Sequence, residues 1–174
     1  MFPDMRRKKQ MLSDQDSVDI LTSGIYGVLG TAGTDAWPYA VPISYAFDPT
    51  PDAEAGAPAG RIYLHSAVSG HKLEAIEENP HVSFAVVGHN EVAPEQLTNI
   101  FRSVIAFGCA RRARDVDEKC TGLVALGAKY CPGLDDFVTE EIVKSLDRTE
   151  VIVIDLERIT GKEAIELVRE RQRP

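Results

Sequence analysis

The chain has 174 residues, of which 44% are hydrophobic and 26% charged, and its formal net charge is −8 at pH 7. This length and composition predict one soluble globular domain with a hydrophobic core. The negative charge argues against a nucleic-acid interface or an anionic membrane surface, because both favour a basic protein surface. An anionic ligand would therefore need a local site that overcomes an unfavourable overall field.

Cysteine usage and the first ten residues bear on cellular location. Cys109, Cys120 and Cys131 form neither a CxxC pair nor an even disulfide framework, which predicts reduced thiols. Residues 1–10 are basic, but no apolar segment follows them and no long apolar run occurs in the chain, so we expect neither a secretory signal nor a membrane span. We expect a cytoplasmic protein whose residues 1–10 form a mobile N-terminal arm.

A helix and a β-hairpin are predicted first along the chain. Ser13, with Asp16 three residues later, resembles a capping box that opens a helix ending at about Ser23. Two β-rich runs, 25–31 and 37–47, are separated by a short Gly-containing turn and predict a hairpin.

The second strand of this hairpin contains a proline. Pro42 leaves a gap in the hydrogen-bond ladder, which is typical of an edge, a bulge or a ligand site. Residues 48–60 are rich in Pro, Ala and Gly and predict a surface loop. One face of the strand is expected to carry Tyr39, Val41, Ile43, Tyr45 and Phe47.

The central stretch 61–84 reads as a strand, a Ser/Gly turn, a short helix, a stop at Pro80 and a second strand. Ser69 is the expected N-cap of the helix. Hydroxyl groups, Gly70, free backbone N–H groups and Lys72 then meet at a helix N-terminus. This combination is typical of a phosphate-binding site.

Several side chains in this stretch have a second interpretation. Lys72 is either a phosphate ligand or a solvated helix residue, and Ser66 either binds the phosphate or caps the helix. His65 and His71 either donate charge-assisted hydrogen bonds to a phosphate or pack against another partner. A metal site built from the four histidines is disfavoured, since no HExxH or CxxC spacing occurs.

The C-terminal half adds strands and helices around the same core. Residues 88–102 are expected to be irregular, with a short turn after Pro94. Asp115 and Glu118 resemble a second N-terminal capping pair. The further predicted elements are a strand over 103–111, a helix from 115 to about 130 broken at 131–133, a helix over 139–146, a strand over 151–156 and a charged helical tail over 161–174. Residues 11–160 would form a single, mainly β domain with flanking helices.

Four motifs resemble one known family. PYAVPISYAF, RIYLHSAVSGHKLEAIEENP, RSVIAFGCAR and VIVIDLERITGKEA occur in the order found in the FMN-binding split barrels related to pyridoxamine 5′-phosphate oxidase. Within these, the chain is most similar to the nitroimidazole-resistance (Nim) proteins, over roughly residues 6–164. The resemblance implies a six-stranded Greek-key split barrel that forms a homodimer, with FMN in each of two clefts at the subunit interface.

The resemblance also implies which residues bind FMN. The segments that match the family's phosphate site contain His65, Ser66, Ala67, Gly70, His71 and Lys72. The segment that lies along the isoalloxazine contains Tyr39, Val41, Pro42, Ile43 and Ser44. Arg102 opens a strand that in relatives runs close to the cofactor. The chain departs from the oxidase in having Gly70–His71–Lys72 in place of an Arg–Lys pair, and it lacks that enzyme's C-terminal arginine segment, so we do not expect vitamin oxidation.

The function implied is an FMN-dependent oxidoreductase that reduces a small acceptor such as a nitroimidazole or another nitroaromatic. No catalytic side chain is assigned, because no Ser/His/Asp or Cys/His signature occurs and the cofactor would carry the chemistry. Three alternatives stay open: a non-catalytic flavin-binding or storage protein, a haem-binding relative, and a structural domain whose acidic surface meets a basic partner.

Overall fold

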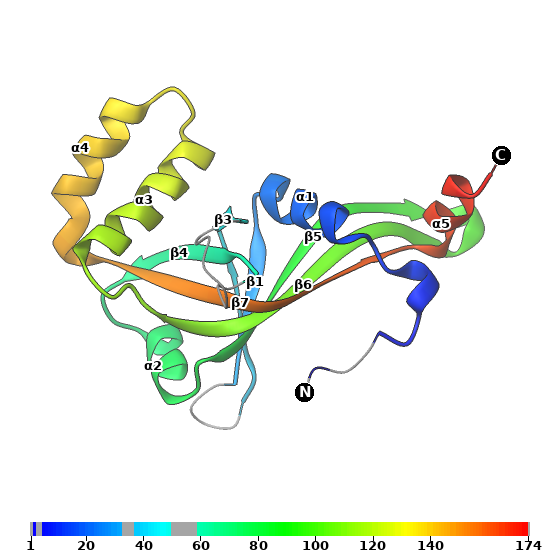
Figure 1. The fold of residues 1–174 in the computed structure, drawn as a ribbon, viewed down its shortest axis with the longest axis horizontal. Helices are drawn as coiled ribbons and strands as arrows, with labels where there is room; N and C mark the ends of the chain where they lie inside the picture. Colours follow the sequence, from blue (N-terminus) through cyan, green and yellow to red (C-terminus); the bar gives the residue numbers. More distant parts are fainter. Residues whose placement is uncertain (1, 3–4, 33–36, 50–58, 174) are drawn as a thin grey trace.

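The computed structural model describes residues 2, 5–32, 37–49 and 59–173. Its centre is one antiparallel sheet, with α3 and α4 at one end of the molecule and α5 near the other (Figure 1). The strand order is β2-β1-β5-β6-β7-β4-β3. The strands are β1 (Gly27–Thr31), β2 (Tyr39–Ile43), β3 (Ala46–Asp48), β4 (Arg61–Ala67), β5 (His81–Ala93), β6 (Thr98–Arg112) and β7 (Thr149–Glu163). The mainly β architecture with flanking helices is confirmed.

The sheet has seven strands instead of the expected six, and it is not closed. The predicted strand over 37–47 is in fact two strands, since β2 pairs with β1 at one edge and β3 pairs with β4 at the other. Between them the backbone of Tyr45 bonds to a side chain: its N–H donates to the Tyr130 hydroxyl (2.9 Å), which in turn lies 3.0 Å from the Tyr45 carbonyl. Pro42 lies on an edge strand, as its missing N–H suggested.

The helices are α1 (Asp14–Ser23), α2 (His71–Glu78), α3 (Val116–Tyr130), α4 (Asp135–Ser145) and α5 (Ile165–Arg171), with short 3-10 turns η1 (Lys8–Gln10), η2 (Pro94–Gln96) and η3 (Leu146–Arg148). Two predicted N-caps are confirmed: Ser13 accepts the N–H of Asp16 (3.1 Å) and Asp115 accepts the N–H of Glu118 (2.8 Å). Helix α4 begins four residues earlier than predicted.

The largest errors concern the lengths of the C-terminal strands. Residues 88–102, expected to be irregular, continue β5 and β6 as a hairpin around η2. Strand β7 extends from Thr149 to Glu163, so the predicted helical tail begins only at Ile165. Along residues 157–163 only Glu157 is exposed and the two buried residues are Gly161 and Glu163, so the extension lacks the period-two apolar pattern by which a strand is recognised.

The N-terminal arm contacts the end of β7. Gln10 is 4% exposed, and its side-chain amide donates to the Glu163 carbonyl (2.9 Å). The N–H of Leu12 donates to the Gly161 carbonyl (3.1 Å). Mobility of residues 1–10 stays a prediction, but these contacts hold the end of the arm.

Two hydrophobic clusters stabilise the fold. The main core, on the inner face of the sheet, includes Leu29, Phe84 and Ile152. A second cluster lies between α3 and the outer face, where Leu126 packs with Tyr63 and Val153. Helix α3 therefore covers the outer face over β7, β4 and β3. In the part of the chain that the structure describes, no helix has the length and apolarity that crossing a membrane requires.

The outer face over β1, β5 and β6 is not covered in the same way. Val28 lies opposite Ala85 and Ala85 opposite Ile105, which makes a continuous apolar row across the three strands. Val28 is 38% exposed and Ile105 43% exposed. Val87, on the same face of β5, is also exposed. One half of the outer face is thus packed under α3, and the other half presents apolar side chains to solvent.

Candidate functional site

The N-terminus of α2 lies at the end of β4, after a short loop. Gly70 is the N-cap and has a φ of 141°, a conformation that side-chain-bearing residues rarely adopt. No side chain caps the helix, so Ser69 is not the N-cap that we expected. Apart from its chain neighbours, no atom of the described residues lies within 4 Å of the point where a Cβ on Gly70 would stand. The N–H of Leu73 donates to the Gly70 carbonyl (2.9 Å). The N–H groups of His71 and Lys72 have no acceptor within the helix and face an open position, which suits an anion.

Ser66 does not cap the helix either. Its side chain is nearly buried, and its hydroxyl donates to the carbonyl of Ala67 (2.6 Å). His65 and Ala67 alternate with it on β4 and are exposed. Lys72 is half-buried in the first turn of α2. The structure therefore leaves the imidazole of His65 and the first turn of α2 accessible, while the Ser66 hydroxyl donates to the backbone at the end of β4.

Strand β2 meets the first turn of α2 through two aromatic rings. The rings of Tyr39 and His71 pack edge to face, with centroids 4.6 Å apart. The Nδ1 atom of His71 lies 3.9 Å from a carboxylate oxygen of Glu74. The segment predicted to lie along the isoalloxazine and the segment predicted to bind the phosphate are thus in contact.

The other predicted residues of β2 alternate between the two faces of the strand. Val41 and Ile43 are partly buried and pack against the main core, while Pro42 is exposed. Ser44 follows the strand and is half-buried. Val41 and Ile43 thus direct their side chains to the core and pair with β1, and a role of this segment beside a flavin ring stays a prediction.

Arg102 lies away from this site within one chain. Arg112, at the end of the same strand, contacts the loop before α2, and ten residues of β-strand span about 33 Å. The Nε atom of Arg102 lies 3.4 Å from the Oε2 atom of Glu163. Arg102 also borders a separate cavity of about 280 Å³ with His89 and Ile20. A contribution from Arg102 to the cleft of a second subunit stays a prediction.

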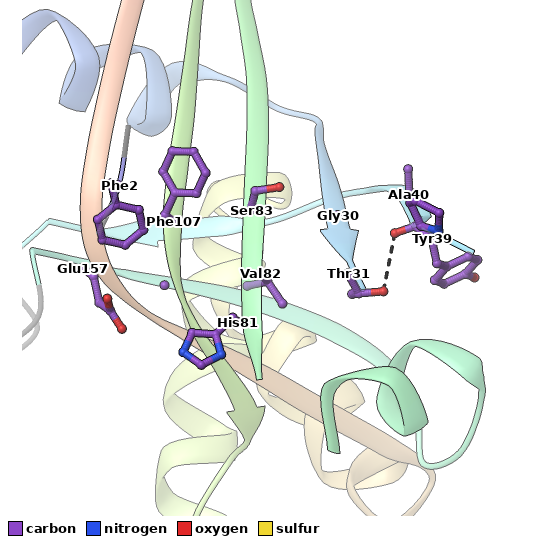
Figure 2. Close-up of a pocket in the computed structure, with 12 residues that line it drawn as sticks. Phe2, Gly30, Thr31, Tyr39, Ala40, His81, Val82, Ser83, Phe107 and Glu157 are labelled. Atoms are coloured by element: carbon purple, nitrogen blue, oxygen red, sulfur yellow. Dashed lines mark hydrogen bonds between the residues drawn. The ribbon is translucent and has the colours of Figure 1, made fainter. Parts of the chain in front are cut away.

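A cavity of about 430 Å³ lies on the outer face of the sheet beside Tyr39. Figure 2 shows Tyr39, Ala40 and Thr31 along one side and Phe2, Phe107 and Glu157 along the other. The hydroxyl of Thr31 donates to the Tyr39 carbonyl at 3.5 Å. The residues that line the cavity are Phe2, Gly30, Thr31, Pro38, Tyr39, Ala40, His81, Val82, Ser83, Phe107, Gly108 and Glu157. Aromatic and small residues form most of the wall, with a few polar groups between them.

Sequence reasoning assigned only Tyr39 among the residues of this cavity. The outward direction of Phe107 follows from alternation along β6, but its neighbours come from β1, β5 and β7 through strand pairing. The thiol of Cys109 lies 3.3 Å from a carboxylate oxygen of Glu157. Burial, together with that hydrogen bond, raises the pKa of the Cys109 thiol, which disfavours the thiolate. Within residues 2, 5–32, 37–49 and 59–173, no cluster of three or more His, Cys, Asp or Glu side chains is arranged to hold a metal.

Arg112 supports the site from the end of β6, and sequence reasoning missed it. Its guanidinium donates to the Val68 carbonyl (3.1 Å), to Glu77 on α2 (2.8 Å) and to Glu150 on β7 (3.0 Å). The loop before α2 is thereby tied to both α2 and the sheet. No signal in the sequence distinguishes this arginine from Arg111, because its partners come from three different segments.

Replacing Arg112 by methionine is expected to loosen this loop and to weaken anion binding at α2 by about three- to tenfold, since roughly one charge-assisted hydrogen bond to the loop is lost. The apolar stem of the side chain is kept, so the midpoint of thermal unfolding should change little. Isothermal titration with FMN measures the first effect. An unchanged dissociation constant would show that the loop holds its shape without Arg112.

The open seven-stranded antiparallel sheet and its flanking helices are consistent with the split-barrel class of fold. A model of the pyridoxamine 5′-phosphate oxidase family matches residues 13–163. The chain belongs to this family. A comparison with curated proteins found no match.

Solved structures share the fold at low sequence identity. A candidate 5-nitroimidazole antibiotic resistance protein from Bacteroides thetaiotaomicron is 19% identical with a TM-score of 0.65, over 88% of this chain and 86% of that one. The conserved hypothetical protein Rv2991 from Mycobacterium tuberculosis is 18% identical with a TM-score of 0.75, over 98% and 94%. The FAD and heme binding protein from Mycobacterium smegmatis is 19% identical with a TM-score of 0.68, over 95% and 81%.

Proposed function

We propose that this protein is an FMN-dependent oxidoreductase that passes electrons from the reduced flavin to a small acceptor such as a nitroimidazole or another nitroaromatic. The observation that carries the proposal is the contact between Tyr39 and His71. It joins the open helix N-terminus, which suits a phosphate, to a largely apolar cavity, which suits an aromatic ring system.

The chain's own residues would hold the flavin at its two ends. The first-turn N–H groups of α2 and the Lys72 ammonium would bind the phosphate, with His65 and His71 as further donors. The backbone of residues 41–44 would face the polar edge of the ring. FMN would supply the electron-transfer chemistry, and the protein would supply binding, orientation and electrostatics.

A homodimer is part of the proposal. The apolar row formed by Val28, Ala85 and Ile105 is exposed in a single chain, and the outer edge of β2 has no strand partner among the described residues. A second copy on this face would bury both features and would close the cavity from the outside. Size-exclusion chromatography with light scattering tests the dimer.

The acceptor class is supported by two features. The cavity combines the aromatic side chains of Tyr39 and Phe107 with polar groups from Ser83 and His81, a combination that suits a small planar aromatic compound with polar substituents. The candidate 5-nitroimidazole resistance protein shares the fold. A Tyr39→Ala variant should raise the KM for such an acceptor.

The test of the proposal is flavin binding by the purified protein. We expect one FMN per chain, seen as flavin absorbance and as quenching of FMN fluorescence, and tighter binding of FMN than of FAD. Lys72→Glu should weaken FMN binding by about ten- to a hundredfold, because it removes a charge-assisted contact and adds a repulsive charge. Lys119→Glu on α3 is the control with the same change of charge. Failure to take up flavin, or equal binding by the two variants, would overturn the assigned site.

Turnover separates the enzyme from its alternatives. A flavin-storage protein would bind FMN but would not reoxidise it faster with a nitroimidazole, which anaerobic stopped-flow absorbance measures. A haem-binding relative would show a Soret band when purified from haem-supplemented cells. A structural domain would bind neither cofactor, and its properties would not respond to Lys72→Glu.

A further inference from the structure

Four consecutive cations, Arg6, Arg7, Lys8 and Lys9, form an exposed run that includes most of η1. The run is anchored directly after its last residue, where the buried side chain of Gln10 bonds to Glu163 on β7. The guanidinium of Arg7 donates to the side-chain oxygen of Gln10 at 3.3 Å. The four charged side chains therefore project from a segment that is fixed to the rest of the protein through Gln10.

Helix α5 brings further cations to the same place, because η1 contacts α5. Segments 5–10 and 165–173 together contain seven basic and two acidic residues, although the whole chain has a net charge of −8. The salt bridge between Arg171 and Glu163 (2.6 Å) uses one of these cations. Among the described residues, no salt bridge involves Arg6, Lys8, Lys9, Arg169 or Arg173. We call these five residues with Arg7 and Arg171 the basic patch.

One end of the basic patch, at Arg6, lies near the cavity of the candidate site. Phe2 lines that cavity, and its ring lies 5.3 Å from the ring of Phe107. Its carbonyl accepts a hydrogen bond from Arg158 on β7 (3.3 Å). Arg6 follows four residues later, so the two Cα atoms are at most about 14 Å apart. A protein bound at the basic patch would reach the edge of the proposed flavin cleft.

We propose that the basic patch is the docking surface for a small acidic electron-carrier protein of the ferredoxin or flavodoxin class, which reduces the bound flavin. The proposal rests on the proposed function, which requires a reductant. The overall negative charge would repel an acidic carrier from most of the surface. The basic patch would attract it and would orient it toward the cleft.

The electron balance is complete with the carrier as reductant. Two ferredoxin molecules each lose one electron as an iron ion passes from the ferrous to the ferric state. The flavin gains both electrons, and protons from solvent balance the charge. No covalent bond to the protein forms or breaks.

The test is anaerobic stopped-flow reduction of the FMN-loaded full chain by photoreduced ferredoxin and, separately, by reduced flavodoxin. We expect the second-order rate constant to fall steeply with rising salt. Lys8→Glu with Lys9→Glu should lower it by about tenfold at low salt and flatten the salt dependence. The control pair, Lys119→Glu with Arg148→Glu, changes the net charge equally at the other end of the molecule and should stay within about twofold of the wild type.

The outcomes are distinct from failure of the proposed function. The docking proposal is wrong if the protein takes up FMN and dithionite reduces it, but both carriers reduce the Lys8/Lys9 variant as fast as the control variant. If the protein takes up no flavin, fluorescence anisotropy of labelled ferredoxin still tests the docking surface. Loss of ferredoxin binding in the Lys8/Lys9 variant, but not in the control variant, supports the docking surface. Equal ferredoxin binding by the two variants overturns it. Stronger binding to anionic vesicles or to RNA than to either carrier would also overturn the choice of partner.

Discussion

Replacing Gly108 by alanine is expected to lower the free energy of unfolding by about 3 kcal/mol, the range found when an atom is forced into a packed core. A Cβ at this position would overlap the carbonyl oxygen of Asp155 on β7. The pairing of β6 with β7 shifts register between Phe107 and Gly108, so the two strands are paired irregularly at this point. The obstacle is backbone, which no change of rotamer can remove.

Gly133→Ala provides the matched control for this prediction. Gly133 has a φ of 78°, but within the described part of the chain no atom beyond its neighbours lies within 4 Å of the position of an added Cβ. The substitution therefore strains only the local backbone, by about 1 kcal/mol. Urea unfolding followed by circular dichroism measures both variants. The explanation by a clash with the Asp155 backbone would be wrong if Gly108→Ala were no more destabilising than Gly133→Ala.

Acidification from pH 4.5 to pH 2 is expected to remove about 2–3 kcal/mol of stability through one carboxyl group. The two side-chain oxygens of Glu118 each accept from Arg111, at 2.7 and 2.8 Å, and one also accepts the N–H of Arg114 (2.7 Å). These bonds lower the pKa of Glu118 from 4.5 to about 2, and the hydrogen bonds with Arg111 make the largest contribution. As the pH falls, the Glu118 carboxylate is protonated in the unfolded chain before it is protonated in the folded protein. Its contribution to stability is therefore fully present above pH 4.5 and is lost as the pH approaches 2.

Two amide substitutions on α3 test this assignment. Glu118→Gln should lower stability at pH 7 and should flatten the dependence on pH below 4.5, because the titrating group is gone. Asp117→Asn, at an exposed position one residue earlier, should keep the wild-type dependence. Urea unfolding at intervals between pH 2.5 and 7 gives both curves. Parallel curves for wild type and Glu118→Gln would assign the acid sensitivity to another carboxyl group.

Arg111 and Arg112 are consecutive residues of β6, and alternation directs them to opposite sides of the strand. Arg111 holds α3 to the outer face through Glu118 and also bonds to Asp155 on β7 (2.9 Å). Arg112 holds the loop before α2. The end of one strand therefore positions both the helix that covers half of the outer face and the helix that carries the proposed phosphate site.

Local signals in the sequence predicted the elements whose limits depend on neighbouring residues. The caps at Ser13 and Asp115 and the helix end at Asn79 each depend on groups a few residues apart, which a sequence displays directly. The same holds for the alternation that buries Val82 and Phe84. Four motifs in their order along the chain were also sufficient to recognise the family.

Tertiary structure alone decided how those elements combine. The division of residues 37–47 into two edge strands follows from the Tyr130 hydroxyl, which takes the backbone bonds of Tyr45 from a helix 85 residues away. The full lengths of β5, β6 and β7, the separation of Arg102 from α2 and the cavity beside Tyr39 all depend on strand register. Register is set by pairing between distant segments, and no residue in a single segment carries that information.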